Sequence, residues 1–314
     1  MKKKYEKRIL FIGMPDMALV CLHKLNEKGI NIIGVVPPPK EDPTYSLMVN
    51  NAKSMGYELV EYEKNLNEKE FLNKIRNLNA DLGVVASYNK KFPKELLRLP
   101  KDGFINLHPS KLPDYRGANP YSHVIINGEE ESAITLHFMD EEFDTGDIIS
   151  QYRFSLDLNE TMGTLFYRTN EMCASMLYEA LDYYESHEFP RKPQPLGNEK
   201  KKAYALSFAK RNVFIDWNKS AVEIERFIRA LNPFIGAVTM YKGYVVRINS
   251  AKIIKQKHHY APGTIIEAKK NIKIACGKDI IMPECLQYGG FFISNAKEFI
   301  ERVKLKKGDI FDNG

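Results

Sequence analysis

The sequence is poor in cysteine, and its four cysteines follow no pattern that would bind zinc or frame a set of disulfides. None belongs to a C-x-x-C pair, and none has a histidine at the spacing of a zinc site. We therefore expect buried thiols at Cys21, Cys173, Cys276 and Cys285.

Long apolar runs are also missing. No run approaches the roughly 18 residues that a membrane-spanning helix needs. The basic start leads through a short apolar run into Pro15 and Asp16 without a small-residue cleavage site, so it predicts a first strand and not a signal peptide. The sequence thus predicts a cytoplasmic protein with no membrane partner.

The glycine-rich turn of dinucleotide-binding enzymes is absent. The first apolar run, residues 8–13, leads into GMPDMA and not into G-x-G-x-x-G, so a nicotinamide or flavin cofactor is not expected. An acidic excess is absent as well. The net charge of +6 favours anionic partners, such as a nucleic acid or a nucleotide-linked small molecule, and does not choose between them.

Strand-like and helix-like stretches alternate through the first half of the chain. The predicted strands are residues 8–13, 30–36, 57–61, 82–86, 105–107 and 133–138, and the predicted helices are residues 17–28, 67–78 and 161–184. This alternation is typical of a parallel sheet that is covered by helices on both faces and binds ligands beyond the carboxyl ends of its strands.

The composition changes after the long helix. Residues 189–202 hold three prolines and five basic residues, which indicates a linker. Beyond it, a helix at residues 221–231 precedes short strands at 237–241, 244–248, 263–267 and 272–276, a spacing that favours a small barrel.

The predicted fold class is therefore α/β, with a doubly wound, mostly parallel, Rossmann-like sheet followed by a small OB-like C-terminal β-barrel. We expect a catalytic domain at residues 1–188, a linker at 189–203 and the barrel at 204–314.

The most informative stretch is residues 104–151. Asn106 and His108 lie two apart at the end of a predicted strand, so their side chains point to the same face. A loop rich in proline and glycine follows, and a later strand is followed by the turn Asp144-Thr-Gly-Asp147. A lone histidine is usually a core residue, but this ordered set favours a catalytic site. The two aspartates lack a second histidine or cysteine in register, so they are weak grounds for a metal.

This set resembles the formyltransferases that use 10-formyltetrahydrofolate, in particular the methionyl-tRNA formyltransferases. The matching residues are Asn106, His108, Ser110, Leu112, Pro113, Tyr115-Arg116-Gly117 and Asp144-Thr145-Gly146-Asp147. The resemblance continues in RILFIGMPDMA near the start, FIDW at 214–217, IRALNPFIGA at 228–237 and IACG at 274–277. It covers essentially the whole chain in order.

The resemblance implies a transfer of the formyl group from 10-formyltetrahydrofolate to a primary amine, with no metal. Asn106 and His108 would donate hydrogen bonds to the oxygen on which negative charge develops. His108 would also carry a proton, because its ordinary pKa of about 6.5 suits exchange at neutral pH. Asp144 would orient His108 and favour its imidazolium form.

The resemblance also implies two further groups of binding residues. Those expected at the folate are Ala86, Ser87, Tyr88, Phe92, Ser110, Lys111, Leu112, Pro113, Met139, Asp140, Glu141 and Phe143. Those expected at the acceptor are Met14, Pro15, Tyr115, Arg116 and Gly117. Core packing is an equal alternative for Phe92 and a lesser one for Tyr88 and Phe143.

Two departures bear on the acceptor. Lys111 stands at a usually apolar position, and residues 37–48 are shorter and more balanced in charge than the basic loop that inserts against tRNA in methionyl-tRNA formyltransferases. Against this, the C-terminal region is basic, with Lys252, Lys255, Lys257, Lys269, Lys270 and Lys273. A surface that binds tRNA and an ordinary solvent-exposed surface explain these lysines about equally well.

We therefore expect a small or nucleotide-linked amino-sugar acceptor first and methionyl-tRNA as a close alternative. A 10-formyltetrahydrofolate hydrolase is a lesser alternative, because water could replace the amine at the same three residues. A non-catalytic RNA-binding module is disfavoured by the intact set. A homodimer formed through the C-terminal barrel is compatible with the sequence, although no residue demonstrates it.

Overall fold

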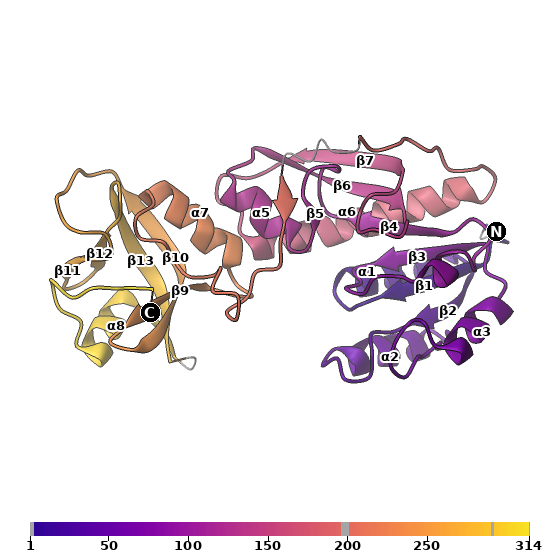
Figure 1. The fold of residues 1–314 in the computed structure, drawn as a ribbon, viewed down its shortest axis with the longest axis horizontal. Helices are drawn as coiled ribbons and strands as arrows, with labels where there is room; N and C mark the ends of the chain where they lie inside the picture. The colour runs from indigo at the N-terminus through magenta and orange to yellow at the C-terminus, as the bar shows by residue number, and fades with distance from the viewer. Residues whose placement is uncertain (1–2, 196–200, 290–291, 314) are drawn as a thin grey trace. The chain divides into compact units, whose positions relative to one another are not determined.

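The structure is a computed structural model that describes residues 3–195, 201–289 and 292–313. Its residue contacts form two compact units (Figure 1). Unit 1 comprises Met1–Gly117, Glu131–Phe154 and Tyr167–Lys202, and unit 2 comprises Ala118–Glu130, Ser155–Phe166 and Ala203–Gly314. The boundaries expected at residues 188 and 204 stay a prediction, and residues 196–200 of the expected linker lie outside the described part of the chain.

Unit 1 is built on a six-stranded sheet in the order β2-β1-β3-β4-β6-β7. Its strands are β1 (Ile9–Gly13), β2 (Ile32–Val36), β3 (Leu82–Ala86), β4 (Phe104–His108), β6 (Glu131–Phe138) and β7 (Ile148–Ser155). β1 pairs in parallel with β2 and β3, and β3 pairs in parallel with β4, whereas β6 runs antiparallel to β4. The sheet is therefore mixed and mostly parallel.

Apolar side chains alternate between the two faces of this sheet. On β1, Ile9 and Phe11 pack with α1 (Met17–Lys28) and α6 (Met162–Tyr184) on one face. Leu10 and Ile12 pack with α3 (Lys69–Asn77) and α4 (Lys94–Leu97) on the other. Both faces are covered, because each strand is apolar at almost every position.

The strand order reverses between β1 and β3, and both strands end at the same edge of the sheet. β1 and β3 run side by side in register from Ile9↔Leu82 to Gly13↔Ala86, and just beyond them the Met14 amide donates to the Ser87 carbonyl at 2.9 Å. Ligands of open α/β sheets bind beyond such a reversal. The predicted site lies at the carboxyl end of β4, beside this reversal, and the loop after the antiparallel β6 returns Asp144 to it.

Two local predictions in unit 1 were wrong. Residues 57–61 form only a single parallel bridge, Val35↔Leu59, because the chain turns away after one contact with β2. Residues 37–48 are not all loop, since α2 (Tyr45–Ser54) begins at Tyr45 and packs Met48, Val49 and Ala52 inward. Within the expected linker, Lys192 bridges to Ile148 of β7 and Phe189 is buried.

Unit 2 has its own core and a six-stranded antiparallel sheet. The order is β11-β12-β13-β10-β9, and β14 pairs with β13. Its strands are β9 (Ala237–Tyr241), β10 (Tyr244–Ile254), β11 (Ile265–Ala268), β12 (Ile272–Ala275), β13 (Ile280–Tyr288) and β14 (Phe292–Asn295). Its helices are α5 (Pro120–Ile126), α7 (Ala221–Leu231) and α8 (Ala296–Val303).

The helix α7 starts where the sequence supplies a capping box. The Ser220 hydroxyl accepts from the Glu223 amide, and the Glu223 carboxylate accepts from the Ser220 amide. Ile224 and Ile228 then face the unit 2 core with Trp217. The short segments β5 (Arg116–Gly117) and β8 (Lys202–Ala203) complete the described elements. The predicted fold class, a mostly parallel α/β sheet followed by a small β domain, is confirmed.

The described helices include none that combines the length and the apolar composition required to cross a membrane.

Candidate active site

Asn106 and His108 project from the same face of β4 at its carboxyl end. They alternate with Ile105 and Leu107, which point into the core on the opposite face. Asn106 is partly exposed, whereas His108 is only 5% exposed. The site therefore contains an amide that solvent can reach, from Asn106, and an imidazole that is almost fully buried, from His108.

Asp144 brings these two side chains together. Its Oδ1 lies 3.5 Å from Asn106 Nδ2 and 3.5 Å from His108 Nδ1, and its Oδ2 accepts the Gly117 backbone amide at 2.9 Å. Asp144 adopts a left-handed backbone with φ of 59°. Few non-glycine residues do so, and such conformations are common where a side chain must be aimed.

The partners of His108 determine where it can take up a proton. Its Nε2 lies 2.9 Å from the Tyr115 carbonyl oxygen, which can only accept, so Nε2 carries a hydrogen. Nδ1 is then the free nitrogen of the neutral ring, and it faces Asp144. A proton arriving at His108 would bind at Nδ1, next to a carboxylate.

Burial sets the charge states of this pair. Burial lowers the pKa of His108 below its usual value, and the charge of Asp144 offsets only part of that effect. Burial opposes the ionisation of Asp144, but His108, His137 and the Gly117 amide outweigh it, so the pKa of this carboxyl lies below its usual value. At neutral pH the site thus holds an ionised Asp144 and a neutral His108. As expected, Asp144 favours the imidazolium form of His108 by raising its pKa, but the opposite effect of burial is larger.

A second histidine, His137, completes the cluster and was missed in the sequence. It lies directly opposite Asn106 in the register of β4 and β6. Its Nδ1 lies 2.7 Å from the Phe138 carbonyl oxygen and must donate to it, so Nε2 accepts from Asn106 Nδ2 at 3.2 Å. His137 therefore orients the Asn106 amide. Ile134, Leu136 and Phe138 alternate along β6, so His137 lies on the opposite face from these apolar residues, and this pattern could have identified it from the sequence.

Gln194 is the other residue that sequence reasoning missed, because it lies in the expected linker. Its side chain is buried, and its Nε2 donates to the backbone carbonyls of Asp144 at 3.1 Å and Gly146 at 2.6 Å. Its Oε1 accepts from Arg116 Nε at 3.2 Å and from Arg116 Nη2 at 2.7 Å. Gln194 thus ties the turn of Asp144 to the loop that ends in Gly117.

The residues expected at the folate after β3 lie near the strand reversal. Ser87 follows Ala86 with φ of 58°, and the Tyr88 hydroxyl lies 2.7 Å from that of Tyr62. Phe92 is buried edge-on against Phe104, with ring centroids 5.3 Å apart, so its packing is that of a core residue.

The segment expected at the folate after β4 is closely held. The Ser110 hydroxyl donates to the Asp114 carbonyl at 2.9 Å, and the Leu112–Pro113 peptide bond is cis. Leu112 is buried, and Lys111 forms an ion pair with Glu131 at the surface. Lys111 therefore has a protein partner at the position where the sequence departs from the resemblance.

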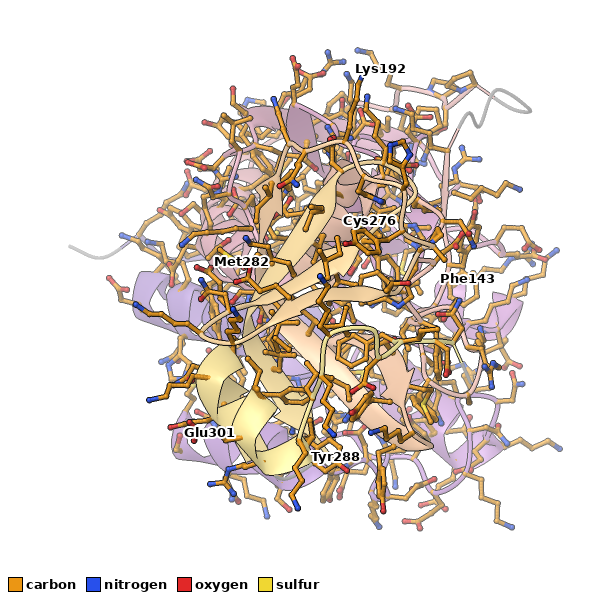
Figure 2. The ribbon with its side chains drawn as sticks, turned by 90° about the vertical axis from the view of Figure 1, so that its left-hand side faces the viewer. Phe143, Lys192, Cys276, Met282, Tyr288 and Glu301 are labelled. Carbon is orange, nitrogen blue, oxygen red and sulfur yellow. The ribbon has the colours of Figure 1, made fainter. Side chains whose placement is uncertain are left out.

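The segment expected at the folate after β6 is the most exposed of the three. Asp140 accepts from the Thr145 hydroxyl at 2.6 Å, and Glu141 pairs with Lys94 at 2.7 Å. Met139 donates its amide to the Phe104 carbonyl at 2.8 Å, and Phe143 is 50% exposed (Figure 2). An apolar ring in solvent beside the cluster is suited to cover a ligand.

The residues expected at the acceptor fall into two groups. Met14 and Pro15 follow β1, where Met14 is partly exposed and Pro15 is buried. Tyr115, Arg116 and Gly117 instead serve the cluster, through the contacts to His108, Gln194 and Asp144 given above. Their contact with an acceptor stays a prediction.

Within residues 3–195, 201–289 and 292–313, histidine, cysteine and acidic side chains form no group of three that could hold a metal ion.

Comparison with known families identifies the chain. Residues 7–181 match the model described as formyl transferase, and residues 208–304 match the model described as formyl transferase, C-terminal domain. The chain belongs to the formyl transferase family and is a formyltransferase.

Individual relatives extend over nearly the full length. The chain is 34% identical over 309 residues to a methionyl-tRNA formyltransferase of Alkaliphilus oremlandii (strain OhILAs), covering 96% of this chain and 99% of that protein. It is 36% identical to a methionyl-tRNA formyltransferase of Clostridioides difficile (strain 630), covering 89% and 92%. The crystal structure of WlaRD, a sugar 3N-formyl transferase, superposes with a TM-score of 0.65 at 21% identity over 88% of this chain and 97% of that one. That likeness confirms the fold alone.

Replacing His137 tests its hold on Asn106. In His137→Leu the Asn106 amide loses an acceptor, so we expect kcat/KM to fall about three- to tenfold, the size of one hydrogen bond. His137→Gln keeps an acceptor oxygen and should retain more activity. Steady-state kinetics measure both, and equal losses in the two variants would contradict this role.

Replacing Gln194 tests the turn that holds Asp144. Gln194→Met removes all four hydrogen bonds, and we expect kcat to fall roughly 10- to 100-fold through misplacement of the carboxylate, with a smaller change in KM. Gln194→Glu keeps the acceptor for Arg116 but loses the donor to the two carbonyls, so it should fall as well. Wild-type kcat in Gln194→Glu would show that the donor is not needed.

Proposed function

We propose that this chain transfers a formyl group from 10-formyltetrahydrofolate to the amino group of methionyl-tRNA. The observation that carries the proposal is identity of 34% along 96% of the chain, and along 99% of a relative named methionyl-tRNA formyltransferase. Both family domains are represented in the chain, so the likeness is not confined to the catalytic half.

In this proposal the contacts of each residue determine its role in the reaction. 10-Formyltetrahydrofolate supplies an activated formyl carbon. The Asn106 amide keeps one N–H on His137 and turns the other, which makes only a long 3.5 Å contact to Asp144, to the formyl oxygen as charge develops there. Neutral His108 accepts a proton at Nδ1 from the attacking amine, and Asp144 stabilises the cation that results. His108 then returns the proton to N10 of the folate as the bond between N10 and the formyl carbon breaks.

The residues after β3 and β6 have the chemistry that a folate ring requires. They offer backbone hydrogen-bonding groups, the half-exposed ring of Phe143 next to Asp144 and the partly exposed ring of Tyr88. These are the residues we assign to the folate. Phe92 would act through packing, because it is buried against Phe104.

Unit 2 supplies exposed cations for an RNA acceptor. Lys255, Lys257, Lys269 and Lys270 are exposed and form no ion pair among the described residues. Lys252 and Lys273 differ, because they pair with Glu284 and Glu267. Unpaired lysines are suited to phosphate, since they give up no protein partner on binding.

A nucleotide-linked amino sugar is the second candidate, and it was the first expectation from the sequence. One observation still favours it. The connection from β2 to α2 is short, and Lys40 within it pairs with Glu63 at 2.8 Å, so it offers little free positive charge. The relatives weigh more, because their identity spans the whole chain.

An acceptor screen decides between these candidates. We expect formyl transfer from 10-formyltetrahydrofolate to charged initiator tRNA, with kcat/KM well above that for nucleotide-linked amino sugars. His108→Ala should lower the rate roughly 10²- to 10⁴-fold through loss of the proton acceptor. Faster formylation of an amino sugar would reverse the assignment, and folate turnover at the same rate without any amine would indicate a hydrolase.

The salt dependence gives a matched control. Lys269→Gln combined with Lys270→Gln should reduce the slope of log affinity for tRNA against log salt by about one to two. Lys252→Gln, which removes a paired lysine, should change the slope less.

A further inference from the structure

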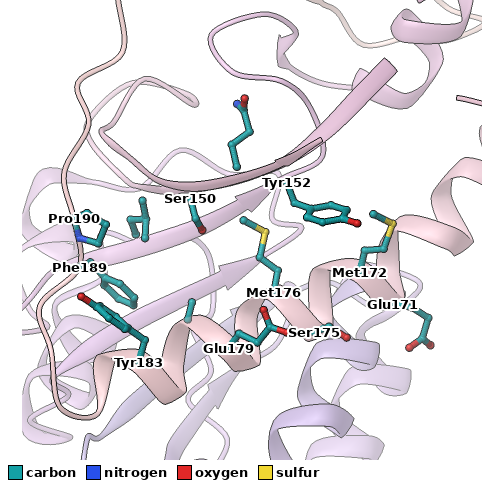
Figure 3. A pocket seen from close by; sticks show the side chains of 13 residues that line it. Ser150, Tyr152, Glu171, Met172, Ser175, Met176, Glu179, Tyr183, Phe189 and Pro190 are labelled. Atoms are coloured by element: carbon teal, nitrogen blue, oxygen red, sulfur yellow. The ribbon is translucent and has the colours of Figure 1, made fainter. Parts of the chain in front are cut away.

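Unit 1 carries a large open cavity between β7 and α6 whose lining includes none of the predicted catalytic residues. Its volume is about 720 Å³, within the range of roughly 300–1,000 Å³ that is typical of small-molecule sites. Figure 3 shows its lining, in which Tyr152 of β7 faces Met172 and Met176 of α6, with Tyr183 and Phe189 at one end.

The cavity lies on the face of the sheet opposite to the catalytic cluster. α6 packs on the face that holds Ile105 and Leu107, whereas Asn106 and His108 point to the other. None of the three predicted catalytic residues lines the cavity. Gln151, at its border, turns its amide away and donates to the Leu112 carbonyl at 3.1 Å. A ligand here would not occupy the folate or acceptor positions.

The chemistry of the lining is apolar with a negative charge. Methionine, tyrosine and phenylalanine side chains dominate, and Glu179 of α6 stands among them beside Met176 and Tyr183 (Figure 3). A second carboxylate, Glu171, lies toward the other end. Neither makes a hydrogen bond or an ion pair within the described residues, and no lysine or arginine is among the lining residues.

Such a lining selects one class of ligand. Aromatic faces and carboxylates both attract a cation, whereas the two methionines adapt to apolar groups of varied shape. An anion would meet two uncompensated carboxylates. We propose that this cavity binds an organic cation, with an apolar body against Met172, Met176 and Phe189 and a protonated amine at Glu179.

The free edge of β7 does not by itself supply an alternative occupant. Lys192 already pairs with Ile148 through two backbone hydrogen bonds of 2.9 and 3.0 Å, so the start of this edge is covered. A second copy of the chain would have to bind farther along β7.

Three matched probes test the proposal on the full-length protein. 4-Phenylbutylamine, 4-phenylbutanol and 4-phenylbutyrate share one apolar body and differ in charge. Methyl-labelled methionine spectra report binding, with Met172 and Met176 assigned by substitution to leucine. We expect the amine to bind most tightly and to shift the Met172 and Met176 signals, while Met14 and Met139, which lie outside the cavity lining at the positions expected for acceptor and folate, stay in place.

A variant pair isolates the charge. Glu179→Gln should raise the dissociation constant of the amine about two- to fivefold, as for one solvent-exposed ion pair, and leave that of the alcohol unchanged. Glu27→Gln removes an exposed carboxylate of α1, outside the lining, and should change neither.

Three results would overturn the proposal. Equal affinity for the three probes would make the cavity a general apolar surface. Shifts confined to Met14 and Met139 would place binding at the expected acceptor and folate positions instead. Probe-free, concentration-dependent shifts of Met172 and Met176 that follow dimer formation in sedimentation would assign the cavity to a second copy of the chain.

Discussion

The candidate active site depends on one buried charge, the carboxylate of Asp144. Its side chain is only 11% exposed, so an ionised state there requires compensation from the protein. The Gly117 amide and the Asn106 amide donate to it, and a proton bound at His108 Nδ1, 3.5 Å away, would add a positive charge beside it. The convergence of β4 and the loop at Gly117 on Asp144 follows from that requirement.

The turn that holds Asp144 is fixed from behind. Gly146 packs so closely against the Phe138 carbonyl that an added Cβ would lie 1.9 Å from its oxygen, so the turn needs glycine there. The Gln194 side chain donates hydrogen bonds to two carbonyls of this turn, and Arg116 donates to the Gln194 side-chain oxygen. The chain thus uses a segment after α6, distant in sequence, to position a catalytic loop.

Much of the fold could be predicted from periodicity. The strands β1, β3, β4 and β9 and the helices α1 and α7 lie where the apolar patterns indicated, because each buries a continuous run or one helical face. β7 was missed because its residues are mostly exposed or partly exposed and lack a buried run. Residues 57–61 have a strand-like pattern but meet β2 at one point only, which depends on tertiary pairing.

The site was predictable to the extent that it lies in one stretch of sequence. The spacing of Asn106 and His108 gave their shared face, and the geometry brings Asp144 within 3.5 Å of both. His137 escaped notice because a histidine inside an apolar strand resembles a core residue. Gln194 could not be found, because its role comes only from long-range contacts.

The protonation of His108 tests the central claim most directly. Nitrogen-15 spectra of histidine-labelled protein, assigned with His108→Gln and recorded across pH, report both the tautomer and the pKa. The structure predicts a hydrogen on Nε2, a free Nδ1 and a pKa below about 6.5. Because Asp144 raises the pKa of His108, the pKa should fall further in Asp144→Asn. A hydrogen on Nδ1 in the neutral ring, or a pKa that rises in Asp144→Asn, would contradict the account.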